Sequence, residues 1–398
     1  MSRQPNRDAT FAYQLSPYLV SNRDGTVSNL LTNRRWLASG LRIEQLCDDR
    51  GIVDCRRLRD ISDWDESRMA RVLADLASSR IVFPSHADPF VEYGTRFVDI
   101  ETCTDCNALC WYCPASIRPK SPEFMPSDVF RRVIQEVAAS LDVEWVSLNH
   151  YNEPLLDPHF AARVRLISDY SLRLRLFTNA TLLTMQHVEL LVETGVLESL
   201  VVNLPSPKPA MYKRATGIAM PPDLLGALLS AADRGLAVSI CVNDTPSTLR
   251  AGRDAVVKSF RSVLGSSIPL FFNVTHDRAG LLPDLGLVSG VGDSRGLGGC
   301  RRLLQHAAVS VRGDVFMCCQ DYDQEHIFGS LVAERLPEIL RGSRASAARR
   351  AVFGGDTQAA KDLPCARCIE RLDPRDNVRL RATGGSNQHV QEREVVRD

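Results

Sequence analysis

Three cysteines, Cys106, Cys110 and Cys113, form a C-x3-C-x2-C run that could bind iron. Thiolates are the usual ligands of iron–sulfur clusters, and ferredoxin-type clusters are normally held by four of them. A run of three would hold three corners of a cubane and leave the fourth iron open for a ligand that is not protein. A catalytic cluster needs such an open iron, whereas an electron-transfer cluster does not. The triad therefore predicts a catalytic [4Fe–4S] cluster.

Four further cysteines form a second set towards the C-terminus, at Cys300, Cys318, Cys365 and Cys368. Twelve residues separate Cys300 from Gly313, four more precede Cys318, and the last two cysteines form a C-x2-C pair. Four thiolates would close a second [4Fe–4S] cluster completely. Paired cysteines also make tetrahedral structural zinc sites, so zinc is the alternative for this set.

The remaining cysteines are Cys47, Cys55, Cys103, Cys241 and Cys319, and most are expected to be small buried hydrophobic residues. Cys103 lies three residues before Cys106, so a zinc knot of Cys103 and the triad is the alternative to an open cluster. Cys319 adjoins Cys318 and could replace it as a ligand. It could also be a free thiol near the active site that donates a hydrogen atom.

Composition is that of an ordinary soluble globular protein, with 44% hydrophobic and 24% charged residues among 398. Lys+Arg and Asp+Glu balance at 48 each, which argues against bulk affinity for nucleic acid or an anionic membrane. The N-terminus lacks an apolar run of signal-peptide length, and no segment approaches a membrane span. A cytoplasmic location is therefore expected. Structural disulfides are rare there, so twelve cysteines favour metal binding.

Apolar runs and helical patterns divide the chain into four parts. Residues 1–90 carry a hairpin signal around a polar turn at 22–25, then helical stretches of which 66–78 is the clearer, then a short strand at 81–83. Residues 95–285 alternate strands and helices, which predicts an α/β fold with βαβ units, here a partial (β/α)6 TIM-like barrel. Its strands are expected at 97–100, 143–148, 172–177, 197–203, 236–242 and 270–274.

Residues 296–370 form a cysteine-rich region with a hairpin around Arg312-Gly313-Asp314, and residues 371–398 are charged and expected to be disordered. Functional residues of a barrel lie at the carboxyl ends of its strands. The triad directly follows the first expected strand of the barrel, so it is placed at that end.

These residues resemble the radical S-adenosylmethionine (SAM) enzymes, whose signature is Cys106-x3-Cys110-x2-Cys113 with an aromatic residue, Tyr112, before the last cysteine. The resemblance implies that SAM binds the open iron through its amino and carboxylate groups. Reductive cleavage then gives a 5′-deoxyadenosyl radical that abstracts hydrogen from the substrate. It also implies a reductant such as flavodoxin or ferredoxin.

Further polar residues follow the expected strands in the order of this family and are expected to bind the cofactor. Glu153, preceded by Asn152, resembles the Gly-Gly-Glu-Pro segment that contacts the methionine amino group, although Tyr151 and Asn152 replace its glycines. The segment that begins at Thr178 resembles the Thr-Asn-Gly-Thr segment of the third strand. The full expected set is Tyr112, Asn152, Glu153, Thr178, Asn179, Asn203, Ser206, Asn243 and Arg278.

The second cysteine set resembles the Twitch region, a shortened form of the SPASM auxiliary-cluster region, and implies one closed [4Fe–4S] cluster. Residues 1–90 resemble the winged-helix element that recognises leader peptides in peptide-modifying enzymes; a packing domain and a DNA-binding winged helix are its alternatives. The leading hypothesis is therefore hydrogen abstraction from a ribosomally made precursor peptide. The rival is a dehydrogenase or epimerase of a sugar or aminocyclitol in antibiotic biosynthesis. A zinc-bound scaffold is the non-enzymatic alternative.

Overall fold

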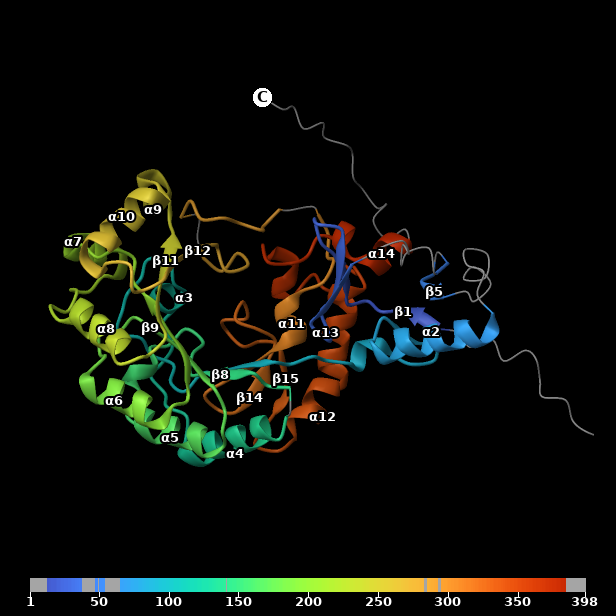
Figure 1. Cartoon of the computed structure of the whole chain (residues 1–398), viewed down its shortest axis with the longest axis horizontal. Helices are drawn as coiled ribbons and strands as arrows, with labels where there is room; N and C mark the ends of the chain where they lie inside the picture. Colours follow the sequence, from blue (N-terminus) through green and yellow to red (C-terminus); the bar gives the residue numbers. More distant parts are fainter. Residues whose placement is uncertain are drawn as a thin grey trace, which may run out of the picture.

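A computed structural model describes residues 13–37, 47–48, 50–53, 65–140, 142–282, 285–292 and 295–383. Its centre is a nine-stranded sheet in the order β12-β11-β10-β9-β8-β7-β13-β14-β15 (Figure 1). The first six strands in this order follow the chain in reverse, and each pairs with its neighbours in parallel. They are β7 (Phe97–Ile100), β8 (Trp145–Ser147), β9 (Leu174–Thr178), β10 (Leu197–Asn203), β11 (Val238–Asp244) and β12 (Leu270–Val274).

Helices connect these strands and curve around one face of the sheet, as the green and yellow arc of Figure 1 shows. The principal ones are α4 (Ser127–Ala138), α5 (Phe160–Asp169), α6 (Met185–Thr194), α8 (Leu224–Asp233) and α10 (Arg253–Leu264), with shorter α3 (Pro114–Ile117), η3 (Pro154–Leu156), α7 (Pro209–Thr216) and α9 (Pro246–Ala251). Successive βαβ units of this kind confirm the predicted α/β fold with a parallel, barrel-like sheet.

Side chains alternate between the two faces of this sheet. The outward residues are aliphatic and fully buried against the helices, for example Val98, Val146 and Leu174. The inward residues one position away are polar or aromatic, for example Asp99 and Ser147. Because successive side chains of a strand point to opposite faces, one face holds the helices and the other is free to line a site.

The cysteine-rich C-terminal region continues the same sheet. Its first strand, β13 (His306–Val309), pairs in parallel with β7, and β14 (Asp314–Phe316) and β15 (Ile327–Ser330) follow as antiparallel strands. The hairpin between β13 and β14 confirms the turn predicted at 312–314. The helices of this region are α11 (Arg301–Gln305), α12 (Leu336–Arg341) and α13 (Ser343–Phe353), followed by η4 (Pro364–Arg367).

The N-terminal region forms two small sheets, β5-β1-β6 and β2-β3-β4. The hairpin of β2 with β3 and the helix α2 confirm the elements expected there. A winged-helix character is not confirmed and stays a prediction, and Cys55 lies outside the described residues. The elements are β1 (Tyr13–Leu15), β2 (Leu19–Ser21), β3 (Thr26–Asn29), β4 (Arg34–Leu37), β5 (Ile52–Val53), α2 (Glu66–Ser78), β6 (Val82–Pro84) and η2 (Pro89–Val91).

The end of the described chain differs from the disordered tail expected from residue 371. Residues 371–383 form η5 (Pro374–Asp376) and α14 (Val378–Ala382), which pack on the N-terminal region. Asn377 is fully buried, and its side-chain amide donates to the carbonyls of Pro17 and Gly298. Residues 384–398 lie outside the described part. Among the described residues, no helix combines the length and the apolar character that a membrane span requires.

Candidate active site

A cavity of about 800 Å³ occupies the inward face of the parallel sheet. Cys106, Cys110 and Cys113 all line it, on the loop that follows β7 and ends at the first residue of α3. Burial, with a further contribution from the neighbouring thiols, raises the pKa of Cys106 and Cys110 to about 12. Thiols with such a raised pKa stay protonated near neutral pH unless a cation stabilises the thiolate. A bound metal does this, because cysteine ligands lose their protons when they bind a metal. The donor set therefore fits an iron–sulfur cluster with three protein ligands.

Cys103 is separated from the triad by its own contacts. Its thiol is fully buried, donates towards the carbonyl of Glu153 at 3.5 Å and accepts from the Asn152 side chain at 3.4 Å. It is not among the residues that line the cavity. This placement disfavours the zinc knot in which Cys103 would have been the fourth ligand.

Glu153 is held in place at the carboxyl end of β8. Its carboxylate accepts from the Thr178 hydroxyl at 2.6 Å, from the Asn179 amide at 2.7 Å and from the Leu155 amide at 3.1 Å. Burial nevertheless outweighs these bonds and raises the pKa of Glu153 to about 7. A cationic group arriving in the cavity would lower that pKa again, because an opposite charge nearby favours the carboxylate.

A row of three asparagines crosses the ends of the next strands. Asn243 donates to Asn203 at 2.8 Å, and Asn273 donates to Asn243 at 3.1 Å. The buried Tyr112 lines the same cavity. The sequence predicted Asn203, Asn243 and Tyr112 but missed Asn273, which directly faces Asn243 in the register of β11 and β12.

Of the three remaining predicted cofactor residues, two line the cavity and one does not. Asn152 and Arg278 line the cavity, and the Arg278 guanidinium lies 5.5 Å from the centre of the Tyr151 ring. Ser206 does not line it: its hydroxyl accepts from the Lys208 amide at 3.1 Å, so it is a satisfied loop residue.

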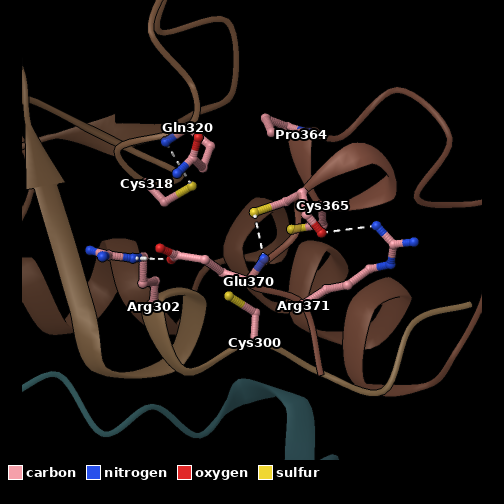
Figure 2. Close-up of a pocket in the computed structure, with 9 residues that line it drawn as sticks. Cys300, Arg302, Cys318, Gln320, Pro364, Cys365, Glu370 and Arg371 are labelled. Atoms are coloured by element: carbon pink, nitrogen blue, oxygen red, sulfur yellow. Dashed lines mark hydrogen bonds and ion pairs between the residues drawn. The ribbon is translucent and has the colours of Figure 1, made fainter. Parts of the chain in front are cut away.

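A second, smaller pocket gathers the C-terminal cysteines. Cys300, Cys318, Cys365 and Cys368 all line it, and the sulfur atoms of the first three point into the space between them (Figure 2). Two backbone amides donate to sulfur here, Gln320 to Cys318 and Glu370 to Cys368, each at 3.4 Å. Four buried thiols around one pocket fit a closed cluster.

Cys318 and Cys319 point to different places, which the sequence could not decide. Cys318 lines the small pocket, whereas Cys319 lines the large cavity beside the triad. Burial raises the pKa of the Cys319 thiol, although Arg302 and Arg278 oppose the rise. Cys300, Arg302 and Glu370 line both spaces, so the two share a wall.

The inward face also carries polar residues that sequence reasoning missed, namely Asp99, Ser147, Arg175 and His306. We call these four the deep tier, because they lie on the strands themselves, before the loops that carry the triad and Glu153. The sequence does carry one signal for such inward residues, which is a polar residue between two aliphatic ones in a strand. Asp99, between Val98 and Ile100, is an example.

Comparison with known families agrees with both parts of the site. Residues 100–246 match the radical SAM superfamily, and residues 300–369 match SPASM, an iron–sulfur cluster-binding domain. The chain therefore carries a radical SAM domain and a SPASM domain. These domains imply S-adenosylmethionine and [4Fe–4S] clusters as cofactors, which confirms the prediction and removes the zinc-scaffold alternative.

Individual relatives fall into two substrate groups. The S-adenosyl-L-methionine-dependent 2-deoxy-scyllo-inosamine dehydrogenase of Niallia circulans is 22% identical over 277 residues, which cover 68% of this chain and 91% of the relative. Streptococcus suis SuiB bound to precursor peptide SuiA has a TM-score of 0.54 at 12% identity and covers 86% of this chain and 90% of its own. A histidine-tagged form of anSMEcpe with bound AdoMet has a TM-score of 0.51 at 14% identity, covering 73% and 92%. The two structures share the fold with this chain.

Proposed function

We propose that Cys106, Cys110 and Cys113 hold the catalytic [4Fe–4S] cluster and that Cys300, Cys318, Cys365 and Cys368 hold the auxiliary one. Their gathering around two adjacent pockets supports this assignment. When bound, the catalytic cluster and S-adenosylmethionine supply a hydrogen-abstracting radical. Glu153 would receive the methionine ammonium, and the neighbouring Thr178 and Asn179 keep its carboxylate oriented. Tyr112, Asn152, Asn203, Asn243 and Arg278 complete the proposed cofactor site.

The substrate that we propose is a small polyhydroxylated or amino-substituted alcohol, oxidised at a carbinol carbon. The deep tier carries this proposal, because it presents hydroxyl, carboxylate, guanidinium and imidazole groups to the same cavity as the triad. Ligand sites typically combine a cavity of this size with a few polar groups that fix orientation. The similarity of this chain to an aminocyclitol dehydrogenase, which covers 91% of that relative, gives independent support for an alcohol substrate.

A precursor peptide is the second candidate. The structure of SuiB with its precursor peptide covers 86% of this chain, a larger share than the dehydrogenase does. In this alternative the N-terminal region would recognise a leader peptide by strand addition. Fluorescence anisotropy with a labelled leader peptide encoded beside this gene tests it: saturable binding supports the peptide, and no binding at any concentration contradicts it.

Cys319 provides a test of an epimerase variant of the same chemistry. Its thiol lines the cavity and is available to return a hydrogen atom to a substrate radical from the other face. An epimerase would place one solvent deuterium on carbon in D2O, and Cys319→Ala would abolish that incorporation. A dehydrogenase would place none there and would yield a ketone.

The experiment that tests the proposed function uses anaerobically reconstituted enzyme, a flavodoxin or dithionite as reductant, and 2-deoxy-scyllo-inosamine as the probe. The alcohol proposal predicts a ketone together with 5′-deoxyadenosine. It is contradicted when neither this probe nor related aminocyclitols and sugars yield a ketone.

A further inference from the structure

Asp99 and His306 form a polar pair on the inward face of the sheet. The Nδ1 atom of His306 lies 3.2 Å from one carboxylate oxygen of Asp99, and the Ser147 hydroxyl donates to the other oxygen at 2.7 Å. The three residues come from neighbouring strands, because β7 lies between β8 and β13. Asp99 pairs directly with Ser147 in the register of β7 and β8. His306 pairs with Phe97, two residues before Asp99, so the side chains of His306 and Asp99 lie on the same face of the sheet. The pair is therefore built by the fold and not by a mobile loop.

The imidazole of His306 lies on the wall of the cavity, with one ring nitrogen paired to Asp99. Its ring centre lies 4.8 Å from that of Phe97 and 6.0 Å from that of Trp145. With Nδ1 directed at Asp99, Nε2 has no hydrogen-bond partner among the described residues, and the side chain lines the cavity. A histidine that is oriented through one nitrogen by a carboxylate offers the other as a proton acceptor.

The other histidines near the cavity are less suited to this role. Both ring nitrogens of His150 are shielded from solvent, and its ring lies against Glu101, Tyr151 and Phe316. Both ring nitrogens of His276 are already engaged: Nδ1 accepts from the Arg278 amide at 3.2 Å, and Nε2 lies 3.4 Å from the Gln320 amide and 3.8 Å from the Glu370 carboxylate. His306, in contrast, is 18% exposed, and its Nδ1 atom lies closer to its carboxylate partner, at 3.2 Å, than the ring nitrogens of His150 and His276 lie to theirs.

Charge around the pair favours an ionised Asp99. Burial alone would raise the pKa of Asp99, but the hydrogen bond and charge of His306, the Ser147 hydroxyl and the charge of Arg302 together lower it. A carboxylate at Nδ1 stabilises the imidazolium that forms when Nε2 takes up a proton. The cationic groups that line the same cavity nearby are Arg175 on β9 and Arg301 and Arg302 on α11.

We infer that His306, positioned by Asp99, accepts the hydroxyl proton of the substrate as its carbinol is oxidised. This inference rests on the proposed alcohol oxidation and names its base. The reaction removes two hydrogens from the substrate: the carbon-bound one leaves as a hydrogen atom and ends in 5′-deoxyadenosine. The hydroxyl one leaves as a proton to Nε2 of His306, and the C–O bond becomes C=O. The remaining electron would be taken up by an oxidised [4Fe–4S] cluster, which Cys300, Cys318, Cys365 and Cys368 would hold.

The test separates hydrogen abstraction from proton removal. The probe is 2-deoxy-scyllo-inosamine deuterated at its carbinol carbons, given to reconstituted wild type, His306→Gln and Asp99→Asn. Mass spectrometry measures deuterium in 5′-deoxyadenosine and, separately, the ketone. General base catalysis contributes typically 10²–10⁴-fold, so ketone formation should fall by about 10²-fold or more in His306→Gln. Deuterium transfer should stay within a few-fold of wild type, and Asp99→Asn should show the same uncoupling.

Controls make each result decisive. The exposed His86→Gln variant should match wild type, and iron content should be equal in all variants. A purely structural role would reduce both readouts together or raise KM for the probe, and it would overturn the inference. An unchanged ratio of ketone to deuterated 5′-deoxyadenosine in both variants would also overturn it. Failure of the wild type to oxidise any aminocyclitol or sugar would instead overturn the proposed function, and this inference with it.

Discussion

For single residues, the surroundings of each sulfur atom separate the cysteines into groups of different chemistry. Two neighbouring cysteines, Cys318 and Cys319, face different pockets although the chain places them side by side. Cys103 is close to the triad in sequence, yet its thiol is bonded to Asn152 and Glu153. Spacing alone could therefore identify the candidates, but only the backbone direction at each residue decides which pocket a thiol enters.

Replacement of Cys318, but not of the adjacent Cys319, should lower the iron content of the protein. Reconstituted wild type should carry about eight irons from two four-iron cubanes. Cys318→Ala should lower this to about four and remove the auxiliary-cluster signal from electron paramagnetic resonance spectra. Cys319→Ala is the matched control and should retain about eight. Loss of iron in Cys319→Ala but not in Cys318→Ala would reverse the assignment of the fourth auxiliary ligand.

Glu153 should make stability depend on pH. Its folded pKa of about 7 lies above the unfolded value of 4.5, so its protonated form is the one the fold prefers. Stability is then present at low pH and is lost as the pH rises towards 7 and above. Without S-adenosylmethionine, wild type should lose about 2 kcal/mol relative to Glu153→Gln between pH 5.5 and pH 8.

Denaturant unfolding of both proteins at the two pH values measures this difference. Iron content is checked first, so that only equally loaded samples are compared. A stability difference that does not change with pH would mean that the Glu153 carboxyl titrates as it does in the unfolded chain. A change of the opposite sign would mean that its pKa is lowered in the folded protein.

The secondary structure elements show what sequence patterns can and cannot foresee. Apolar runs and helical spacing predicted β7, β10 and β12 with the same bounds as the structure, because burial between helices and sheet dictates those patterns. The deep tier was not foreseen, because Asp99, Ser147 and His306 come together only through the register of three strands. The continuation of the sheet into β13 likewise depends on a pairing between residues 97–100 and 306–309.

Asn377 connects three segments and should be costly to truncate. Its side chain caps α14 by accepting from the Leu380 amide and donates to the buried carbonyls of Pro17 and Gly298. Loss of a cap costs about 1 kcal/mol and unsatisfied buried acceptors cost about 1–3 kcal/mol. Asn377→Ala should therefore lower the free energy of unfolding by about 3 kcal/mol.

The comparison is made by denaturant unfolding against the exposed Gln358→Ala variant, which should stay within about 0.5 kcal/mol of wild type. An Asn377→Ala protein as stable as this control would show that α14 is not tied to the N-terminal region in the way described.

In the whole molecule, the N-terminal region shares a hydrophobic core with the C-terminal region. Tyr18, Leu30 and Phe90 pack with Leu304 and Phe353 in one buried cluster. The fully buried Arg349 also donates from α13 to the carbonyl of Phe90 at 2.8 Å. Sequence patterns suggested a separate module in residues 1–90, because they cannot show which distant segment completes a small core.

Deletion of residues 1–90 should therefore damage the auxiliary-cluster region and not only remove a recognition surface. Leu304 and Phe353 would become exposed, and Leu304 lies on the helix that begins directly after Cys300. The truncated protein should aggregate or reconstitute with about four irons in place of about eight. A soluble truncated protein that still binds about eight irons would contradict the shared core.

In the proposed function, one cavity joins an open catalytic cluster to a polar chamber in which a small alcohol is oxidised. The most direct measurement is mass spectrometry of a single-turnover reaction with carbinol-deuterated 2-deoxy-scyllo-inosamine. The proposed oxidation would give one deuterium in 5′-deoxyadenosine and a ketone product that has lost one carbon-bound deuterium and one hydroxyl proton. Unlabelled 5′-deoxyadenosine without any ketone, from this probe and from related aminocyclitols and sugars, would contradict it.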